Sequence, residues 1–290
     1  MPLALARSSR ISCRRSPSAV HTANCCARSR CSVNGIAALN KAIWRASITQ
    51  KFVPRYPCPE CDRGRLRLEK SDFRIKQPGY QHSDVCRDNP EVCSERFTML
   101  LECDNIHCKE VVAVAGNTVT VFEVSGEENT EWVEYLEPRI MTPPPPIIEI
   151  PDNVPLPVTR EIRLSFELYW MDYRVCASRM RTSLERLMDH FGVARFQVVR
   201  DPKHPIKPGK RRLLDLAKRI DKLSHKVGKS EFSEILHALR VVGNLGTHGT
   251  ALKQTTILDA YELYEIALER LFDEKSKIAK AIIRRLKAQR

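Results

Sequence analysis

The chain has 290 residues, which is enough for one or two domains with a hydrophobic core. No apolar run approaches the roughly 20 residues of a membrane-spanning helix, so we expect no membrane segment. The net charge of +13 is unevenly placed, because residues 1–50 and 275–290 contain basic residues and no acidic ones. Basic ends favour polyanions such as nucleic acid, although such charge is more often plain solvated surface.

Residues 1–50 are rich in Ser, Arg, Ala and Cys and show no clear hydrophobic period. Their composition is typical of an organellar transit peptide, which is Arg- and Ser-rich and poor in acid. A disordered tail and a start codon assigned too far upstream explain the same composition, and we favour these two. We therefore predict a disordered or mis-assigned leader, in which only Gly35–Arg45 can form a short helix.

Residues 51–135 have the pattern of a small β module. Two cysteine pairs, Cys58/Cys61 and Cys103/Cys108, each lie between two short strand-like runs. The runs predicted as strands are Phe52–Tyr56, Arg65–Glu69, Phe97–Glu102, Val111–Val114 and Val119–Val124. This strand–turn–strand context is the layout of a zinc ribbon, in which two turns supply two thiolates each.

The four thiolates predict one structural zinc ion per chain. Zinc suits soft thiolate ligands, and four sulfurs fill its tetrahedral coordination and leave no open position for catalysis. Reduced free thiols are the alternative. Cys86 and Cys93 are possible substitutes or a second partial site, whereas His107 is read as a bystander. An odd total of 11 cysteines with Cys-x-x-Cys spacing indicates a reducing compartment, so we expect a cytoplasmic protein.

The second half of the chain is predicted to be helical. Residues 136–158 form a proline-rich linker, since the run Pro143–Pro146 fits neither a helix nor a central strand. In residues 159–290 apolar side chains recur at steps of three and four, which predicts a bundle of four or five helices and a basic C-terminal helix. Within it Gly192–Gly209 is a loop, and two residues one turn apart form an ion pair, Arg181 and Glu185. The predicted fold is thus mainly α, with a small N-terminal β module.

The stretch Ile235–Gly249 begins as an amphipathic helix but contains Gly243 and Gly246, each costing about 1 kcal/mol relative to Ala. Three polar residues spaced by four share one face of this helix: Arg240, Asn244 and His248. Polar groups beside glycines indicate a site that a ligand approaches closely. The structural alternative stays open: Arg240 pairs with a carboxylate, Glu185 first, and the other two satisfy backbone groups near the helix end.

The segment from Pro155 to Leu271 resembles the prokaryotic domain of unknown function family 4145, a helical domain of restriction and defence proteins that often follows a zinc-ribbon-like module. The resemblance rests on short segments in order: Leu156-Pro157, Arg181–Glu185, Leu216–Ile220, and Leu239-Arg240 followed by Gly243-Asn244 and His248. That family is similar to the HEPN superfamily of helical bundles, many of which are metal-independent ribonucleases or act against phage, and which often dimerise. The resemblance therefore implies a HEPN-like bundle, a bacterial restriction or phage-defence context and a homodimer.

The HEPN signature places an Arg, a polar residue and a His on one helix. Asn244 and His248 match the polar and His positions, but Gly243 stands where the Arg is expected, and Arg240 lies one turn earlier. In a catalytic site His248 would move a proton during attack of an RNA 2′-hydroxyl, and Arg240 would stabilise charge on the phosphate. The departure at Gly243 favours a module that binds nucleic acid, RNA ahead of DNA, or assembles with defence-system partners. The alternative is a metal-independent endoribonuclease.

Overall fold

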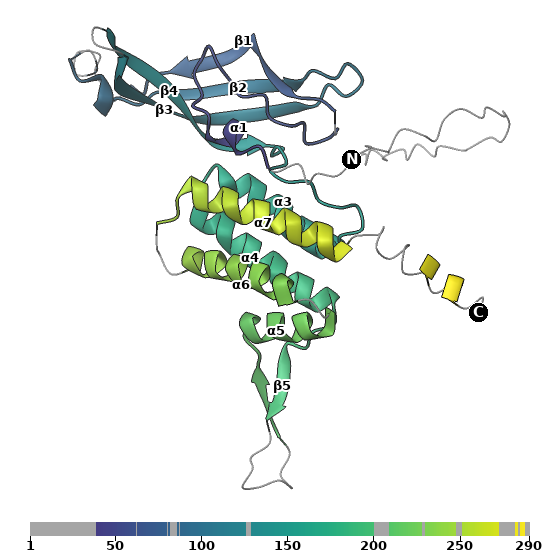
Figure 1. Ribbon diagram of the computed structural model, residues 1–290. Helices are drawn as coiled ribbons and strands as arrows, with labels where there is room; N and C mark the ends of the chain where they lie inside the picture. The colour runs from purple at the N-terminus through teal and green to yellow at the C-terminus, as the bar shows by residue number, and fades with distance from the viewer. Residues whose placement is uncertain are drawn as a thin grey trace, which may run out of the picture. The chain divides into compact units, whose positions relative to one another are not determined.

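The fold is α+β. The computed structural model describes residues 39–61, 63–79, 81, 86, 88–125, 129–199, 209–227, 230–247, 251–272, 282–283 and 285–287 (Figure 1). Helices make up about 44% and strands about 27% of the chain, so the prediction of a mainly α protein is wrong. The physical reason is strand length: Val111–Val114 and Val119–Val124 are parts of one strand of 15 residues, and Arg65–Glu69 lies mostly in a strand of 11 residues, although the predicted strand Phe52–Tyr56 is not formed.

The described residues contain a main sheet of four antiparallel strands in the order β1-β2-β3-β4. The strands are β1 (Leu66–Lys76), β2 (Arg96–Cys103), β3 (Val111–Ser125) and β4 (Asn129–Thr142). Alternate side chains of β2 are buried, as expected for a strand with one face in the core. β4 is absent from the predicted strands, because its glutamates and Pro138 obscure the alternation, and residues 136–142 of the predicted linker belong to it.

Residues 39–50, which the sequence assigns to the leader, pack against the rest of the chain. They contain α1 (Lys41–Arg45), and Trp44 and Ile48 are buried. Ile48 accepts a hydrogen bond from the Leu136 N–H at 2.8 Å, and Gln254 donates its side-chain amide to the Trp44 carbonyl at 3.0 Å. The remainder of the predicted leader lies outside the described residues. A short 3₁₀ helix, Pro90–Val92, precedes β2.

The helical part consists of α3 (Leu156–Tyr169), α4 (Tyr173–His190), α5 (Leu216–Val227), α6 (Ser230–Thr247) and α7 (Gln254–Phe272). The long apolar repeat of the sequence is interrupted between α3 and α4, where Asp172 caps α4 by accepting the Arg174 N–H at 2.7 Å. None of the described helices is long and apolar enough to cross a membrane.

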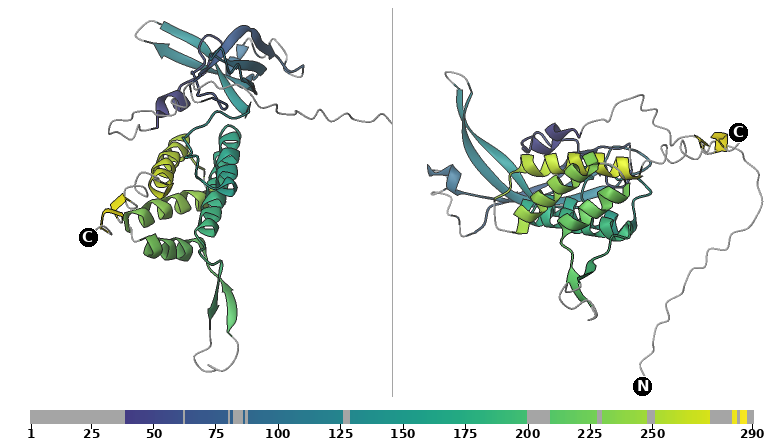
Figure 2. Two further views of the ribbon diagram at one scale, coloured as in Figure 1. Left: turned by 90° about the vertical axis from the view of Figure 1, so that its right-hand side faces the viewer. Right: turned by 60° about the horizontal axis from the view of Figure 1, so that its bottom comes forward.

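A β-hairpin lies between α4 and α5, where the sequence predicts a loop and the beginning of a helix. Strand β5 (Phe196–Val199) pairs antiparallel with β6 (Lys210–Leu213), and both views of Figure 2 show the two strands extending away from the helices. Leu213, predicted to begin the second helix, is instead 67% exposed at the end of β6. Helix α5 begins only after Asp215, which accepts the Lys218 N–H at 2.8 Å.

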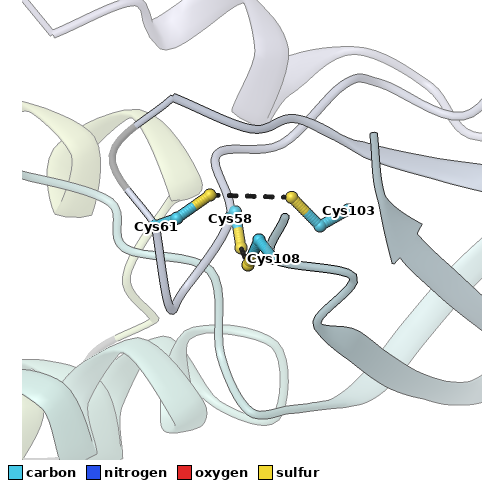
Figure 3. A group of neighbouring side chains, drawn as sticks. All are labelled: Cys58, Cys61, Cys103 and Cys108. Carbon is cyan, nitrogen blue, oxygen red and sulfur yellow. Dashed lines mark hydrogen bonds between the residues drawn. The ribbon is translucent and has the colours of Figure 1, made fainter. Parts of the chain in front are cut away.

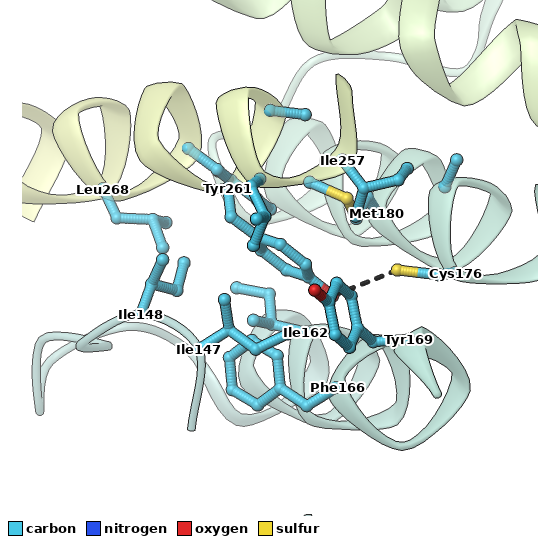
Figure 4. Close-up of a cluster of buried hydrophobic side chains, with 14 of the residues drawn as sticks. Ile147, Ile148, Ile162, Phe166, Tyr169, Cys176, Met180, Ile257, Tyr261 and Leu268 are labelled. Carbon is cyan, nitrogen blue, oxygen red and sulfur yellow. Dashed lines mark hydrogen bonds between the residues drawn. The ribbon is translucent and has the colours of Figure 1, made fainter. Parts of the chain in front are cut away.

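The core of the helical part is built around buried tyrosines that keep hydrogen-bond partners (Figure 4). The Tyr261 hydroxyl donates to the Ser165 hydroxyl at 2.8 Å and lies 3.1 Å from the Cys176 sulfur. Tyr264 and Ser183 share a hydrogen bond of 2.7 Å. These pairings satisfy polar atoms that would otherwise be costly to bury.

The segment after the proline run is part of this core and contacts α7. Ile147 and Ile148 are buried beside Leu268 and Phe166 (Figure 4). The Glu149 N–H donates to Glu265 Oε1 at 2.8 Å. Burial, together with the nearby carboxylates, raises the pKa of Glu265 to about 7 and outweighs the lowering effect of that hydrogen bond.

Replacing Glu265 by glutamine is expected to stabilise the protein at pH 8 by roughly 2 to 3 kcal/mol and to leave it unchanged near pH 4.5. In the unfolded chain Glu265 loses its proton near the ordinary pKa of 4.5, whereas in the folded chain it keeps the proton up to a pKa of about 7. The stability of the wild type therefore falls as pH rises from 4.5 to about 7. The glutamine remains neutral and still accepts from Glu149. Urea unfolding at several pH values measures this, with the exposed Glu167→Gln as control. A glutamine variant less stable than wild type at pH 8 would contradict it.

Candidate functional site

Four cysteine sulfurs meet at one end of the main sheet, as the sequence predicts (Figure 3). Cys58 and Cys61 lie in the turn that precedes β1, while Cys103 ends β2 and Cys108 lies in the turn to β3. All four Sγ atoms are within 4.8 Å of one another, and Cys58 and Cys103 are buried. Pairs far apart in sequence thus form one group of potential metal ligands.

The spacing of the sulfurs fits a tetrahedral metal. The Cys58–Cys108 and Cys61–Cys103 Sγ atoms are each 3.7 Å apart. Zinc–sulfur bonds of about 2.3 Å in a regular tetrahedron separate the sulfurs by about 3.8 Å. The S–S distance in a disulfide is only about 2 Å, so these contacts are not covalent pairs. The four residues therefore can hold one metal ion.

Hydrogen bonds from the turns favour the thiolate form of Cys61, whereas burial raises the pKa of Cys58 and of Cys103. N–H groups point at the sulfurs, with Glu60 N–H 3.4 Å from Cys58 Sγ and Gly64 N–H 3.3 Å from Cys61 Sγ. Burial alone would raise the pKa of Cys61, but hydrogen bonds from the Asn105 amide and the Gly64 and Arg63 N–H groups lower it to about 6. Hydrogen bonds of this kind commonly surround the ligands of metal sites.

Gly64 is required by the close approach of the two turns. A Cβ atom at this position would lie 2.0 Å from Cys103 Sγ and 3.0 Å from Cys61 Sγ. The two turns are also joined by Asp104, which accepts the Arg65 N–H at 2.7 Å, while Asp104 N–H donates to the Arg65 carbonyl at 3.0 Å. Any larger residue at position 64 would displace the sulfurs.

Cys86 and Cys93, considered as substitute ligands or a second partial site, are not part of the four-sulfur group. Cys86 and Cys93 are bonded to each other in a disulfide, so neither substitutes for a member of the four-sulfur group. His107 lies in the turn before Cys108, and its N–H donates to the Asn105 side chain at 3.1 Å.

The two glycines of α6 face α4, not a ligand. A Cβ on Gly243 would lie 2.6 Å from the Arg181 Cβ, and a Cβ on Gly246 would lie 2.5 Å from the Arg174 carbonyl oxygen. Both neighbours belong to α4 and cannot easily move, because one is a backbone atom and the other is attached to the backbone. The glycines thus allow two helices to approach closely.

The polar residues that the sequence places on one face of α6 have different surroundings. Asn244 accepts a hydrogen bond from the Arg181 guanidinium of α4, and Arg181 Nε is 3.5 Å from Glu185 Oε1. Arg240 Nε is buried and has no hydrogen-bond partner among the described residues. His248 lies outside the described residues. The arginine that contacts Asn244 is therefore Arg181, which the sequence indicated only as the partner of Glu185.

The β5–β6 hairpin is a second candidate site that sequence reasoning missed. Its side chains are exposed on both faces, and β6 carries three consecutive cations, Lys210, Arg211 and Arg212. The Arg211 guanidinium lies over the Phe196 ring, 4.6 Å from its centroid. The signal was present in the sequence, since the mostly apolar run Phe196–Val199 and the basic run Lys210–Leu213 flank a proline-rich segment that ends at Gly209.

Comparison with known proteins finds two family matches. Residues 165–288 match a family described as a domain of unknown function, DUF4145, and residues 46–143 match another domain of unknown function, DUF8608. The predicted resemblance of the helical segment to the first family is confirmed. No curated protein and no solved structure matches the chain.

Proposed function

We propose that this protein binds nucleic acid through the β5–β6 ribbon, that single-stranded RNA is its preferred ligand, and that one structural zinc ion holds its cysteine turns together. The observation that carries the binding proposal is the ribbon itself: a two-stranded hairpin whose two faces are both exposed and whose charged residues are all basic among those described. Isolated hairpins are marginally stable in water, so an exposed ribbon of this kind is suited to ordering on a partner.

The two faces of the ribbon differ in chemistry. Residues paired across an antiparallel ladder share a face. One face carries Phe196, Val198, Arg211 and Leu213, and the other carries Gln197, Val199, Lys210 and Arg212. The first face offers a stacking surface beside a cation, and the second offers two cations for phosphates.

Stacking favours a single strand over a duplex. Unpaired bases stack on aromatic rings and on guanidinium planes, which the Phe196–Arg211 pair supplies together. Phosphate contacts from Lys210 and Arg212 add affinity that is independent of base sequence. The preference for RNA over DNA follows from the resemblance of the helical segment to a superfamily that includes many ribonucleases, and duplex DNA is the comparison ligand for the preference for an unpaired strand.

Binding without cleavage is the version that the described residues support. Asn244 accepts a hydrogen bond from Arg181, and α4 occupies the space beside the two neighbouring glycines. The proposal also includes a restriction or phage-defence role and a homodimer, both of which rest on the family resemblance. A ribonuclease centred on Arg240 and His248 has no specific observation in its favour.

Reversing two ribbon charges, Arg211→Glu with Arg212→Glu, is expected to weaken binding to a 20-nucleotide single-stranded RNA by at least about 100-fold at low salt. The slope of log affinity against log salt should become shallower by about 0.7, because the variant removes one of the two phosphate contacts, Arg212, and each phosphate contact on a single strand contributes about 0.7. Phe196→Ala should cost about tenfold without changing that slope. Fluorescence anisotropy across a salt series gives all three values.

The matched control reverses two exposed arginines of α3, Arg160→Glu with Arg163→Glu, which changes the net charge equally. An equal loss in the ribbon and control variants would mean that net charge alone attracts RNA, and the ribbon proposal would fail. Tighter binding of duplex DNA than of single-stranded RNA would reject the preference for an unpaired strand, and equal or tighter binding of single-stranded DNA of the same sequence would reject the preference for RNA.

A further inference from the structure

A cleft of about 710 Å³ lies between residues 44–48, strands β3 and β4, the turn between α3 and α4, and the beginning of α7. Its lining is unusually aromatic: Trp44, Tyr56, Tyr135, Tyr169, Trp170 and Tyr173. The rings of Trp44 and Tyr56 are 5.2 Å apart, and those of Tyr56 and Trp170 are 5.5 Å apart. The size and the aromatic lining fit the ordinary range of small-molecule sites.

Two polar atoms of this lining lack a partner. The Tyr56 hydroxyl and the Trp170 Nε1 are buried and have no hydrogen-bond partner within the described part of the chain, and Tyr56 is 0% exposed. Buried polar groups without a partner are rare in folded proteins. In the helical core, by contrast, the hydroxyl groups of Tyr261 and Tyr264 are equally buried but both are hydrogen-bonded.

Both unpaired atoms are donors. An indole N–H can only donate, and burial raises the pKa of Tyr56, so its hydroxyl keeps its proton. A ligand that satisfies them must present hydrogen-bond acceptors and must be flat enough to lie against aromatic rings. The Tyr135 hydroxyl is different, since it already donates to Glu123.

The rim of the cleft is close to neutral. Arg139 lies 3.2 Å from Glu137, and Arg174 lies 2.8 Å from Asp172. Each cation on the rim therefore has a carboxylate neighbour, which weakens its attraction for a phosphate. The recognition elements are the rings and the two donors.

We infer that this cleft binds a nucleobase, a flat heteroaromatic ring with acceptor atoms for Tyr56 and Trp170. The inference uses no residue of the β5–β6 ribbon and stands whether or not the ribbon binds RNA. The base can come from a free nucleoside or nucleotide or from a nucleic-acid strand. Because the rim is neutral, a nucleoside and its monophosphate should bind with affinities within about threefold of each other.

The test follows tryptophan fluorescence in a Trp132→Phe background, which removes the exposed indole of β4. Adenosine, uridine, adenosine monophosphate and a short oligoribonucleotide are titrated in turn. Quenching by a free nucleoside supports a free-nucleotide site, and quenching by the oligonucleotide alone supports a base supplied by a strand. No quenching by any of the four at millimolar base concentration overturns the inference.

Tyr56→Phe separates a ligand site from an ordinary core. It should weaken nucleobase binding about tenfold and raise or preserve the melting temperature of the free protein, because it removes an unpaired hydroxyl. Tyr264→Phe is the control, because Tyr264 lies in the helical core and not in the lining of the cleft, and it should leave nucleobase affinity unchanged. A Tyr56→Phe variant with unchanged affinity, or with a lowered melting temperature in the free protein, would show that the hydroxyl serves the fold and would reject the site. Arg211→Glu with Arg212→Glu should leave nucleoside binding intact even where it abolishes RNA binding.

Discussion

Cys108→Ser is expected to abolish near-stoichiometric zinc binding and to unfold the end of the main sheet that carries the four cysteines. Structural zinc contributes on the order of 10 kcal/mol of apparent binding free energy, more than a small β module can supply from its own core. Cys108 is the informative ligand because it is only partly buried, so serine fills its space without creating a cavity. Metal analysis of purified protein, together with amide hydrogen exchange of β1 and β2, measures both effects.

The control for the metal prediction removes the disulfide pair instead, Cys86→Ser with Cys93→Ser. These two cysteines are bonded to each other and lie outside the four-sulfur group, so zinc content should stay at about one per chain. Gly64→Ala should lower zinc affinity without removing a ligand, because its Cβ would lie 2.0 Å from Cys103 Sγ. Wild-type protein that carries no zinc and keeps β1 and β2 protected would contradict the prediction.

The cysteine group could be predicted because its information is local. Cys58 and Cys61 lie in the turn before β1, and Cys103 and Cys108 lie at the turn between β2 and β3, and a turn of this kind needs only a few residues to define it. The sequence missed β4 because Glu131, Glu134 and Glu137 recur at every third position and Pro138 lies inside the strand, so the apolar/polar alternation that indicates a strand is broken. Fold class depended on that strand and on the β5–β6 hairpin.

The polar face of α6, in contrast, depends on tertiary contacts that could not be predicted from the sequence. Spacing correctly places Arg240 and Asn244 on one helix, but spacing cannot say which other helix lies against that face. The partner turned out to be α4, through Arg181 and the two glycines. Such a contact joins residues more than sixty positions apart and depends on tertiary packing, which no short pattern encodes.

Replacing both glycines of α6, Gly243→Ala with Gly246→Ala, is expected to destabilise the protein by roughly 2 to 6 kcal/mol, because overpacking typically costs about 1 to 3 kcal/mol per site. If the glycines served a ligand, the same change would stabilise the helix by about 1 kcal/mol each through helix propensity. The two explanations therefore predict opposite signs. The added carbons would meet the Arg181 Cβ at 2.6 Å and the Arg174 carbonyl at 2.5 Å, so α4 and α6 must separate.

Urea unfolding of the double variant measures the sign, with Gly79→Ala as the control. A Cβ on Gly79 meets nothing within 4 Å, and its backbone has no positive φ, so alanine there should change stability by less than about 0.5 kcal/mol. The Asn244→Ala variant completes the argument, because it removes the Arg181 hydrogen bond while keeping the glycines. It should cost about 1 kcal/mol, less than the double glycine variant. A double variant that is more stable than wild type would contradict this prediction and would indicate that the glycines serve a ligand. Arg240 and His248 would then be the first residues to test for RNA contact.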